Sequence, residues 1–147
     1  MKKLILSFIA VMFFSFSFAQ VDAKVNKKKV NKKELIKNST LAVDFLKKEL
    51  KLRGSKLSAV QKAFTKYAEN IATMEEKMLL KDKSAAGNSE ALVANKKAKF
   101  KMMNNFLKLR DEEATKGYSA KDLEKYRKSS RSIHPFTLKI KELKKKK

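Results

Sequence analysis

Apolar side chains recur at intervals of three or four residues along most of the chain, which is the spacing of one face of an α-helix. The pattern is most regular in a helix that we predict over residues 59–82. Its apolar positions are separated by alternating steps of four and three residues: Val60, Phe64, Tyr67, Ile71, Met74 and Met78. This repeat is typical of a helix that packs along a second helix through a narrow seam. Because no segment shows the alternation of a β-strand over a sufficient length, we predict an all-α fold.

A first helix is predicted over residues 32–52. Its apolar residues fall on one face and leave the lysines outside: Leu35, Ile36, Ala42, Val43, Leu46 and Leu50. Asn31 and Glu34 stand three residues apart at its start, as in a capping box. Gly54 follows its predicted end, where glycine takes the left-handed backbone conformation at low cost.

Two short segments have the composition of helix starts. In KLSAVQ, Ser58 and Gln61 stand three residues apart, and in YSAKD the same spacing separates Ser119 from Asp122. In a capping box, two such side chains satisfy two backbone amides of the first helical turn. We therefore predict that Ser58 caps the helix described above and that Ser119 caps a short fourth helix over residues 120–131.

A third helix is predicted over residues 89–114, capped by Asn88 or Ser89. Its apolar residues form two adjacent stripes. Phe100, Met103 and Leu107 lie on the first, and Met102, Phe106 and Leu109 lie on the second. We expect a single partner helix to leave part of so wide an apolar face uncovered.

The amino-terminal end differs from the helical domain, which we place at residues 31–131. Residues 1–19 combine two lysines, an apolar run and a small residue at Ala19. This pattern is typical of a secretory signal peptide cleaved after Ala19. We therefore expect export to the periplasm. Residues 20–30 lack apolar periodicity and are predicted to form a flexible basic arm.

At the other end, residues 132–147 are predicted to form a basic tail. Pro135 interrupts the helical pattern, because proline disfavours helix for the residue before it. Beyond it, the spacing of Phe136, Ile140 and Leu143 predicts one or two further helical turns before the final lysines.

Charge is the strongest compositional feature. The chain carries a formal net charge of +22, and 37 of its residues are lysine or arginine, so it should attract anionic partners. A genome rich in lysine codons would produce the same excess without any function. Only four of the basic residues are arginines, whereas recognition of phosphates and base edges favours the planar guanidinium group. Together with export, this disfavours nucleic acid as a partner.

The sequence contains few groups suited to catalysis. It has one histidine and no cysteine, and it lacks a glycine-rich phosphate-binding loop and a Gly-x-Ser-x-Gly motif. We therefore expect no enzymatic activity, no catalytic residue and no cofactor. Met74 and Met78, one turn apart, offer thioether groups suited to Cu(I). Methionines on a helix seam are more typical of core packing, so we predict no metal site.

The segment LSAVQ, which begins at Leu57, resembles the L-T-x-x-Q motif of the Spy and CpxP group of small periplasmic helical proteins without cysteine. Residues 118–122 resemble a degenerate second copy, which in that group also recurs before a late helix. The resemblance covers residues 31–131 and extends to the signal peptide, the basic charge and the order of the helices.

The resemblance implies an elongated, bent helical hairpin that dimerises into a thin cradle. It also implies an ATP-independent periplasmic chaperone, or a binding protein of the envelope stress response, that holds unfolded or partly folded proteins on a basic surface with apolar patches. For contact with such clients we predict residues of the third helix. The apolar ones are Phe100, Met103, Phe106 and Leu107, and the lysines that would attract clients are Lys97, Lys99 and Lys101.

An alternative hypothesis needs no such surface. It describes a polycationic envelope protein attached to lipopolysaccharide or anionic lipid headgroups through the lysines of residues 144–147 and the arm over residues 20–30. Each lysine near an anionic surface contributes about 1 kcal/mol. This hypothesis predicts that removal of the tail lowers membrane affinity, whereas the chaperone hypothesis predicts little change in client binding.

Overall fold

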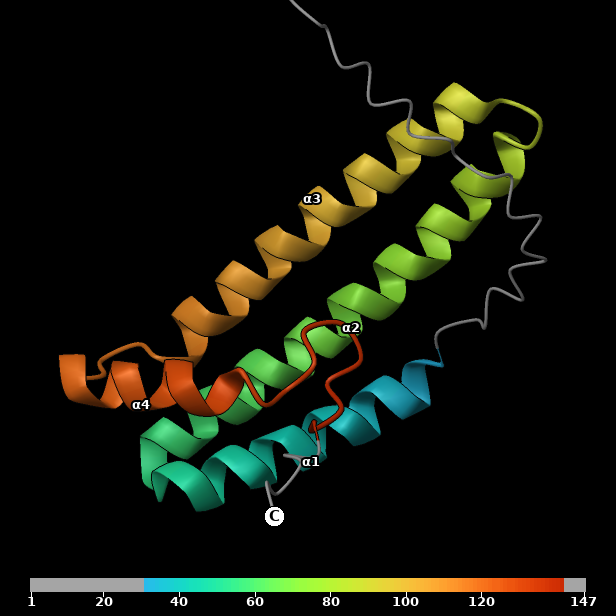
Figure 1. The fold of residues 1–147 in the computed structure, drawn as a ribbon. Coiled ribbons are helices and arrows are strands. Elements are labelled where there is room, and N and C mark those ends of the chain that lie inside the picture. Colours follow the sequence, from blue (N-terminus) through green and yellow to red (C-terminus); the bar gives the residue numbers. More distant parts are fainter. Residues whose placement is uncertain (1–30, 142–147) are drawn as a thin grey trace, which may run out of the picture.

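The computed structural model describes residues 31–141 of the chain. These residues form four helices and no β-strand, which confirms the predicted all-α fold (Figure 1). The helices are α1 (Lys32–Leu50), α2 (Gly54–Ser84), α3 (Ser89–Ala114) and α4 (Ala120–Ser130). The predicted signal peptide over residues 1–19, the basic arm over residues 20–30 and the final residues 142–147 lie outside the described residues.

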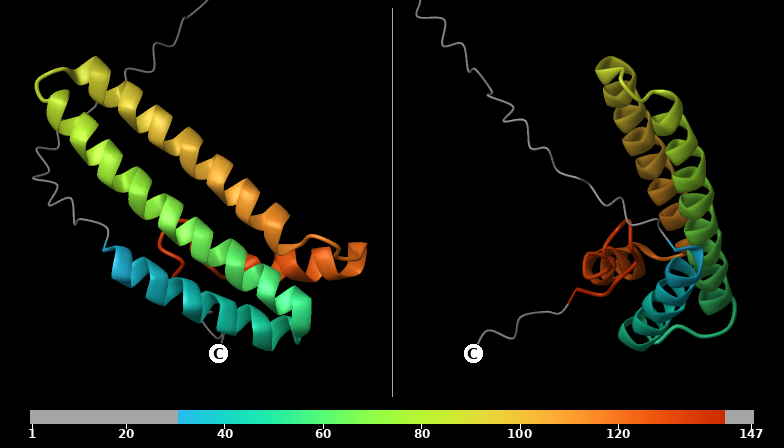
Figure 2. Two further views of the ribbon diagram at one scale, coloured as in Figure 1. Left: turned by 180° about the vertical axis from the view of Figure 1, so that it is seen from behind. Right: turned by 90° about the vertical axis from the view of Figure 1, so that its right-hand side faces the viewer.

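Helices α2 and α3 form a long antiparallel hairpin, and α1 and α4 pack at one end of it (Figures 1 and 2). Because α2 has 31 residues and a helix rises 1.5 Å per residue, α2 is about 46 Å long. The shorter α1 lies along the half of α2 nearer its start. The other end of the hairpin, which we call the far end, contains the α2–α3 turn and extends beyond α1 and α4. The predicted elongated hairpin is therefore confirmed.

The core lies mainly along α2. Every residue of the predicted seam is buried: Val60, Phe64, Tyr67, Ile71, Met74 and Met78. From α1, the core receives Leu35, Ala42, Val43 and Leu46. α3 contributes less, because its buried residues are only Met103, Arg110 and Ala114, all in its second half. The first half of α3, which belongs to the far end, therefore packs on α2 without a fully buried side chain.

Three predicted helix starts are confirmed. At the starts of α1, α3 and α4, the side-chain oxygens of Asn31, Asn88 and Ser119 accept hydrogen bonds from first-turn amides at 3.0, 3.0 and 3.2 Å. The carboxylate of Asp122 in turn pairs with the Lys56 ammonium at 2.9 Å, which joins α4 to the start of α2. These caps satisfy amides that have no partner within their own helix.

The start of α2 differs from the prediction. α2 begins at Gly54, and Arg53 at its N-cap makes no side-chain capping bond. The Leu57 amide already donates a hydrogen bond to the Arg53 carbonyl, at 3.5 Å. Ser58 and Gln61 therefore lie inside the helix, with both side chains exposed. The prediction that they cap α2 is wrong.

Burial of leucines explains this boundary. Lys51, with a left-handed φ of +52°, ends α1 at Leu50, earlier than predicted. Leu52 is then buried, and Leu57 packs against the same core. Burying a leucine side chain contributes about 1.5–3 kcal/mol, which exceeds the ~1 kcal/mol of a serine cap. The connection between the helices is therefore short, and α2 starts before Ser58.

The segment over residues 131–141 folds back onto the helices as an irregular turn. Ile133 and Leu138 are buried in the core, and Ile133 pairs with Ile140 in an isolated antiparallel bridge. Leu138 has a positive φ of 56°, which is incompatible with a continuing right-handed helix. The helical turns predicted in this segment are therefore wrong, and the described part of the predicted basic tail packs into the core.

A buried arginine joins three helices. The Arg110 guanidinium, on α3, lies over the rings of Phe64 and Tyr67 on α2, at 4.6 and 5.1 Å from their centroids. Its Nη2 atom donates a hydrogen bond to Asp111 Oδ1 at 2.6 Å. The same oxygen accepts a hydrogen bond from the Tyr126 hydroxyl of α4 at 2.8 Å. Because arginine keeps its charge when buried, this carboxylate and these rings stabilise it.

Candidate functional site

The predicted client-binding residues of α3 occupy different environments. Phe100 is 58% exposed, whereas Met103 is 6% exposed and lies in the core. Phe106 and Leu107 are half-buried and pack against the core. Of the four apolar residues, Phe100 alone presents most of its side chain to a partner.

The three lysines predicted to attract clients also differ in their environments. Lys97 and Lys101 are exposed. Lys99 points toward α2, where its ammonium group lies 2.6 Å from Glu75 Oε1. Lys99 therefore helps to hold the two helices of the hairpin together, and only Lys97 and Lys101 remain available to attract an acidic client.

The exposed residues of α3 form a mixed surface. Val93 and Phe100 are 51% and 58% exposed, and seven residues make nearly two helical turns, so they share one face. Lys97 lies between them on this face, one helical turn from each, and Lys101 lies one further turn from Lys97, at the edge of the face. We call these four residues the α3 surface. Val93 was not among the residues predicted from the sequence, although its seven-residue spacing from Phe100 places it on the same helix face.

An aromatic contact extends the α3 surface toward the C-terminal segment. The rings of Phe100 and Phe136 meet edge to face, with centroids 6.5 Å apart. The ring of His134 lies 5.8 Å from that of Phe136 in a similar arrangement. Because Phe136 is half-buried, it anchors this end of the surface to the core while leaving part of its ring accessible.

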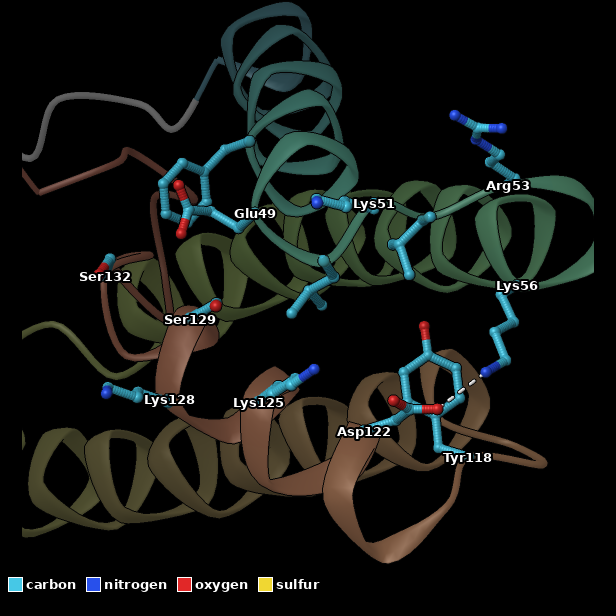
Figure 3. A pocket seen from close by; sticks show the side chains of 13 residues that line it. Glu49, Lys51, Arg53, Lys56, Tyr118, Asp122, Lys125, Lys128, Ser129 and Ser132 are labelled. Carbon is cyan, nitrogen blue, oxygen red and sulfur yellow. Dashed lines mark hydrogen bonds and ion pairs between the residues drawn. The ribbon is translucent and has the colours of Figure 1, made fainter.

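A pocket of about 800 Å³ lies at the end of the hairpin where α1 and α4 pack, opposite the α2–α3 turn in Figure 1, and Figure 3 shows the side chains that line it. Its walls come from the end of α1, the connection to α2, the first turn of α2, and α4 with the residue Tyr118 before it. Phe45, Leu50 and Leu52 supply apolar wall. The pocket was not predicted from the sequence, because its walls come from segments far apart in the chain.

An ion pair defines one side of the pocket. Lys56 Nζ lies 2.9 Å from Asp122 Oδ2 and 5.1 Å from the centroid of the Tyr118 ring. The hydrogen bond between Lys56 and Asp122 raises the pKa of Lys56 and lowers the pKa of Asp122. The Tyr118 hydroxyl is buried and has no hydrogen-bond partner among the described residues. Burial raises the pKa of Tyr118, so its hydroxyl stays protonated at neutral pH.

Within residues 31–141, no three histidine, cysteine, aspartate or glutamate residues come together in an arrangement that could hold a metal ion. Met74 and Met78 are buried in the seam of α2. None of the described helices is both long and apolar enough to cross a lipid bilayer.

Comparison with known proteins identifies no relative: no family model, no curated protein and no solved structure matches this chain. The fold, the α3 surface and the pocket are therefore described from the structure alone, and the resemblance to the Spy and CpxP group stays a prediction from the sequence.

Proposed function

We propose that this protein binds unfolded or partly folded proteins in the periplasm, without ATP, on the α3 surface of its hairpin. The observation that carries the proposal is the exposure of Phe100 and Val93 beside Lys97 and Lys101. Apolar side chains that remain exposed on a lysine-rich helix offer both contact and attraction to a client. Unfolded chains expose apolar groups of their own, so burial of these groups against the α3 surface lowers their free energy.

The two kinds of side chain act at different stages of binding. Lysines attract acidic segments over a distance of about 8–10 Å at moderate salt, which raises the rate of association. Phe100 and Val93 then lose exposed apolar area, which slows dissociation. An elongated hairpin presents this surface along its side, where an extended polypeptide can lie against it.

The test is the suppression of light scattering by an unfolding client, such as reduced α-lactalbumin. The exported chain, residues 20–147, is mixed with the client without ATP at low and moderate salt. We expect suppression at stoichiometric amounts that persists in part at moderate salt, because apolar contacts are not screened.

A pair of variants locates the surface. Phe100→Ala should weaken client binding by about 1 kcal/mol, or roughly fivefold. The substitution removes the ring, and the exposed part of that ring, about half, is what a client can contact. Leu109→Ala is the matched control, because Leu109 is 45% exposed on α3 and nine residues, or two and a half turns, place it on the opposite side. Equal losses in the two variants would contradict the assignment of the α3 surface.

The salt dependence separates this proposal from the envelope hypothesis. If the protein only precipitates with acidic clients, and moderate salt abolishes the effect, its charge is sufficient to explain binding. Vesicles with and without anionic lipid would then show whether the chain binds anionic headgroups through its lysines. Under that outcome, Phe100→Ala would leave binding unchanged.

A further inference from the structure

The pocket between α1, α2 and α4 has the dimensions and the mixed walls of a ligand site. Its volume of about 800 Å³ lies within the range of small-molecule pockets, roughly 300–1,000 Å³. Phe45, Leu50 and Leu52 form apolar wall, so part of the pocket can accept an apolar group of a ligand. Such sites bind ligands that bury an apolar body and place a polar group at a few defined contacts.

The charged groups around the pocket are unbalanced. Lys51, Lys125 and Lys128 line it, and none of the three forms an ion pair within residues 31–141. Of the two carboxylates in the lining, Asp122 is already paired with Lys56, which leaves Glu49. The lysines therefore carry positive charge that these carboxylates do not neutralise, which favours an anionic ligand.

The positions of the side chains support this arrangement (Figure 3). Lys51, at the end of α1, and Lys125, on α4, lie on opposite sides of the opening. Arg53 points away from the opening, so we do not assign it a contact with the ligand.

The Tyr118 hydroxyl provides a neutral donor in the same pocket. It is buried, it has no partner among the described residues, and it points toward the end of α1 and the start of α2. A buried hydroxyl without a hydrogen bond is unfavourable, so a ligand oxygen placed here would be stabilised.

We propose that this pocket binds an amphipathic anion, with a carboxylate or phosphate head between Lys51, Lys125 and the Tyr118 hydroxyl and an apolar chain against Phe45 and Leu50. A free inorganic anion would leave the apolar wall unfilled. A neutral amphiphile would leave the lysines without a partner. This site is separate from the α3 surface and does not depend on the proposed function.

The test uses four probes at concentrations below micelle formation: decanoate, decyl phosphate, decanol and inorganic phosphate. Binding to the exported chain, residues 20–147, is followed by chemical-shift changes of backbone amides in nuclear magnetic resonance spectra. We expect saturable shifts around the pocket with decanoate and decyl phosphate and much weaker binding of the other two. Decanol bound as tightly as decanoate, or inorganic phosphate bound as tightly as decyl phosphate, would overturn the proposal.

Charge variants then separate the site from general attraction. The double variant Lys51→Gln and Lys125→Gln should raise the dissociation constant for decanoate at least tenfold, because it removes two charge-assisted hydrogen bonds. The control, Lys97→Gln and Lys101→Gln, makes the same change in net charge on the α3 surface and should have less than about a twofold effect. Equal effects would mean that decanoate responds to net charge only, and would overturn the site.

A third variant tests the hydroxyl alone. Tyr118→Phe keeps the ring that packs against Tyr126 and removes only the donor, so it should weaken decanoate binding by about fivefold. Unchanged binding would remove Tyr118 from the site. Circular dichroism establishes that each variant is folded. Phe100→Ala should bind decanoate as the parent does, so the pocket and the α3 surface succeed or fail independently.

Discussion

Tyr67 shows how one side chain stabilises several segments at once. Its ring lies under the Arg110 guanidinium, and its hydroxyl donates a hydrogen bond to the Pro135 carbonyl at 2.6 Å. α2, α3 and the C-terminal segment therefore meet at this residue. The sequence predicted that Tyr67 is buried in the seam of α2, but the partners of its hydroxyl and of its ring come from parts of the chain that have no sequence relation to it.

Because Tyr67 is buried, we expect the free energy of unfolding to fall at alkaline pH. Burial raises the pKa of Tyr67 from 10.0 to about 12, so the unfolded chain loses this proton first. The contribution of neutral Tyr67 is therefore complete below pH 10 and is lost as pH rises toward 12. We expect the free energy of unfolding of the parent to fall by roughly 2 kcal/mol more than that of Tyr67→Phe over this interval.

Urea denaturation of the two proteins at a series of pH values measures this difference. Lysines deprotonate in both proteins alike. Tyr126, whose pKa is also raised by burial, is present in both proteins as well. Neither therefore contributes to the difference between them. Curves that stay parallel from neutral pH to strong alkali would contradict the assignment.

Arg110 illustrates a limit of the sequence pattern at the residue scale. The polarity of a charged residue predicts that it lies on the exposed face of its helix, and Arg110 stands among lysines and acidic residues in the sequence. Its burial depends on two rings from α2 and a carboxylate from its own helix, which become neighbours only after the hairpin closes. Periodicity describes one helix at a time, so it cannot find a buried charge whose partners lie on another.

At the scale of single helices, Ser58 and Ser119 form a natural experiment. Both begin a segment with capping-box spacing, but only Ser119 accepts a hydrogen bond from an amide of a helix start. Ser119→Ala should lower the free energy of unfolding by ~1 kcal/mol. Ser58→Ala should leave it unchanged or raise it by a few tenths of a kcal/mol, because alanine favours an exposed helix interior.

Thermal and urea denaturation of the two variants check this prediction. A loss of ~1 kcal/mol in Ser58→Ala would show that α2 begins near Ser58 in solution. The spacing of the side chains is the same in both segments, so the sequence could not distinguish them. The difference arises from Leu52 and Leu57, whose burial fixes the connection between α1 and α2.

At the scale of the whole molecule, residues 131–141 extend the folded domain beyond α4. The sequence identified the four helices and the seam of α2, because those follow from local periodicity. It did not identify the packing of this segment, since Leu138 reaches the core through a positive φ that no composition signals. The pocket was missed for the same reason, because its walls are assembled by tertiary packing.

Two truncations test this extension. A chain that ends at Lys141 loses four lysines but no described core residue, so its free energy of unfolding should match that of the parent. A chain that ends at Arg131 also loses Ile133 and Leu138 and should be less stable by roughly 3–6 kcal/mol, the sum for two buried side chains. Urea denaturation measures both.

Equal stability of the two truncated chains would contradict the packing of residues 132–141. The comparison also sets the correct variant for the envelope hypothesis. Only the chain that ends at Lys141 removes tail charge without disturbing the core, so only that chain can test whether the last lysines bind anionic lipid.

The far end of the hairpin has a further consequence for motion. Before Met103, α3 has no buried residue, and polar links such as Lys99 to Glu75 and Asn95 to Asp82 join it to α2 there. Regions with few buried contacts open locally at a lower free energy than the rest of a protein. Amide hydrogens in the first half of α3 should therefore exchange with solvent sooner than those around Arg110. The hairpin would separate from its tip inward, widening beside Phe100 while the base formed by α1 and α4 stays closed.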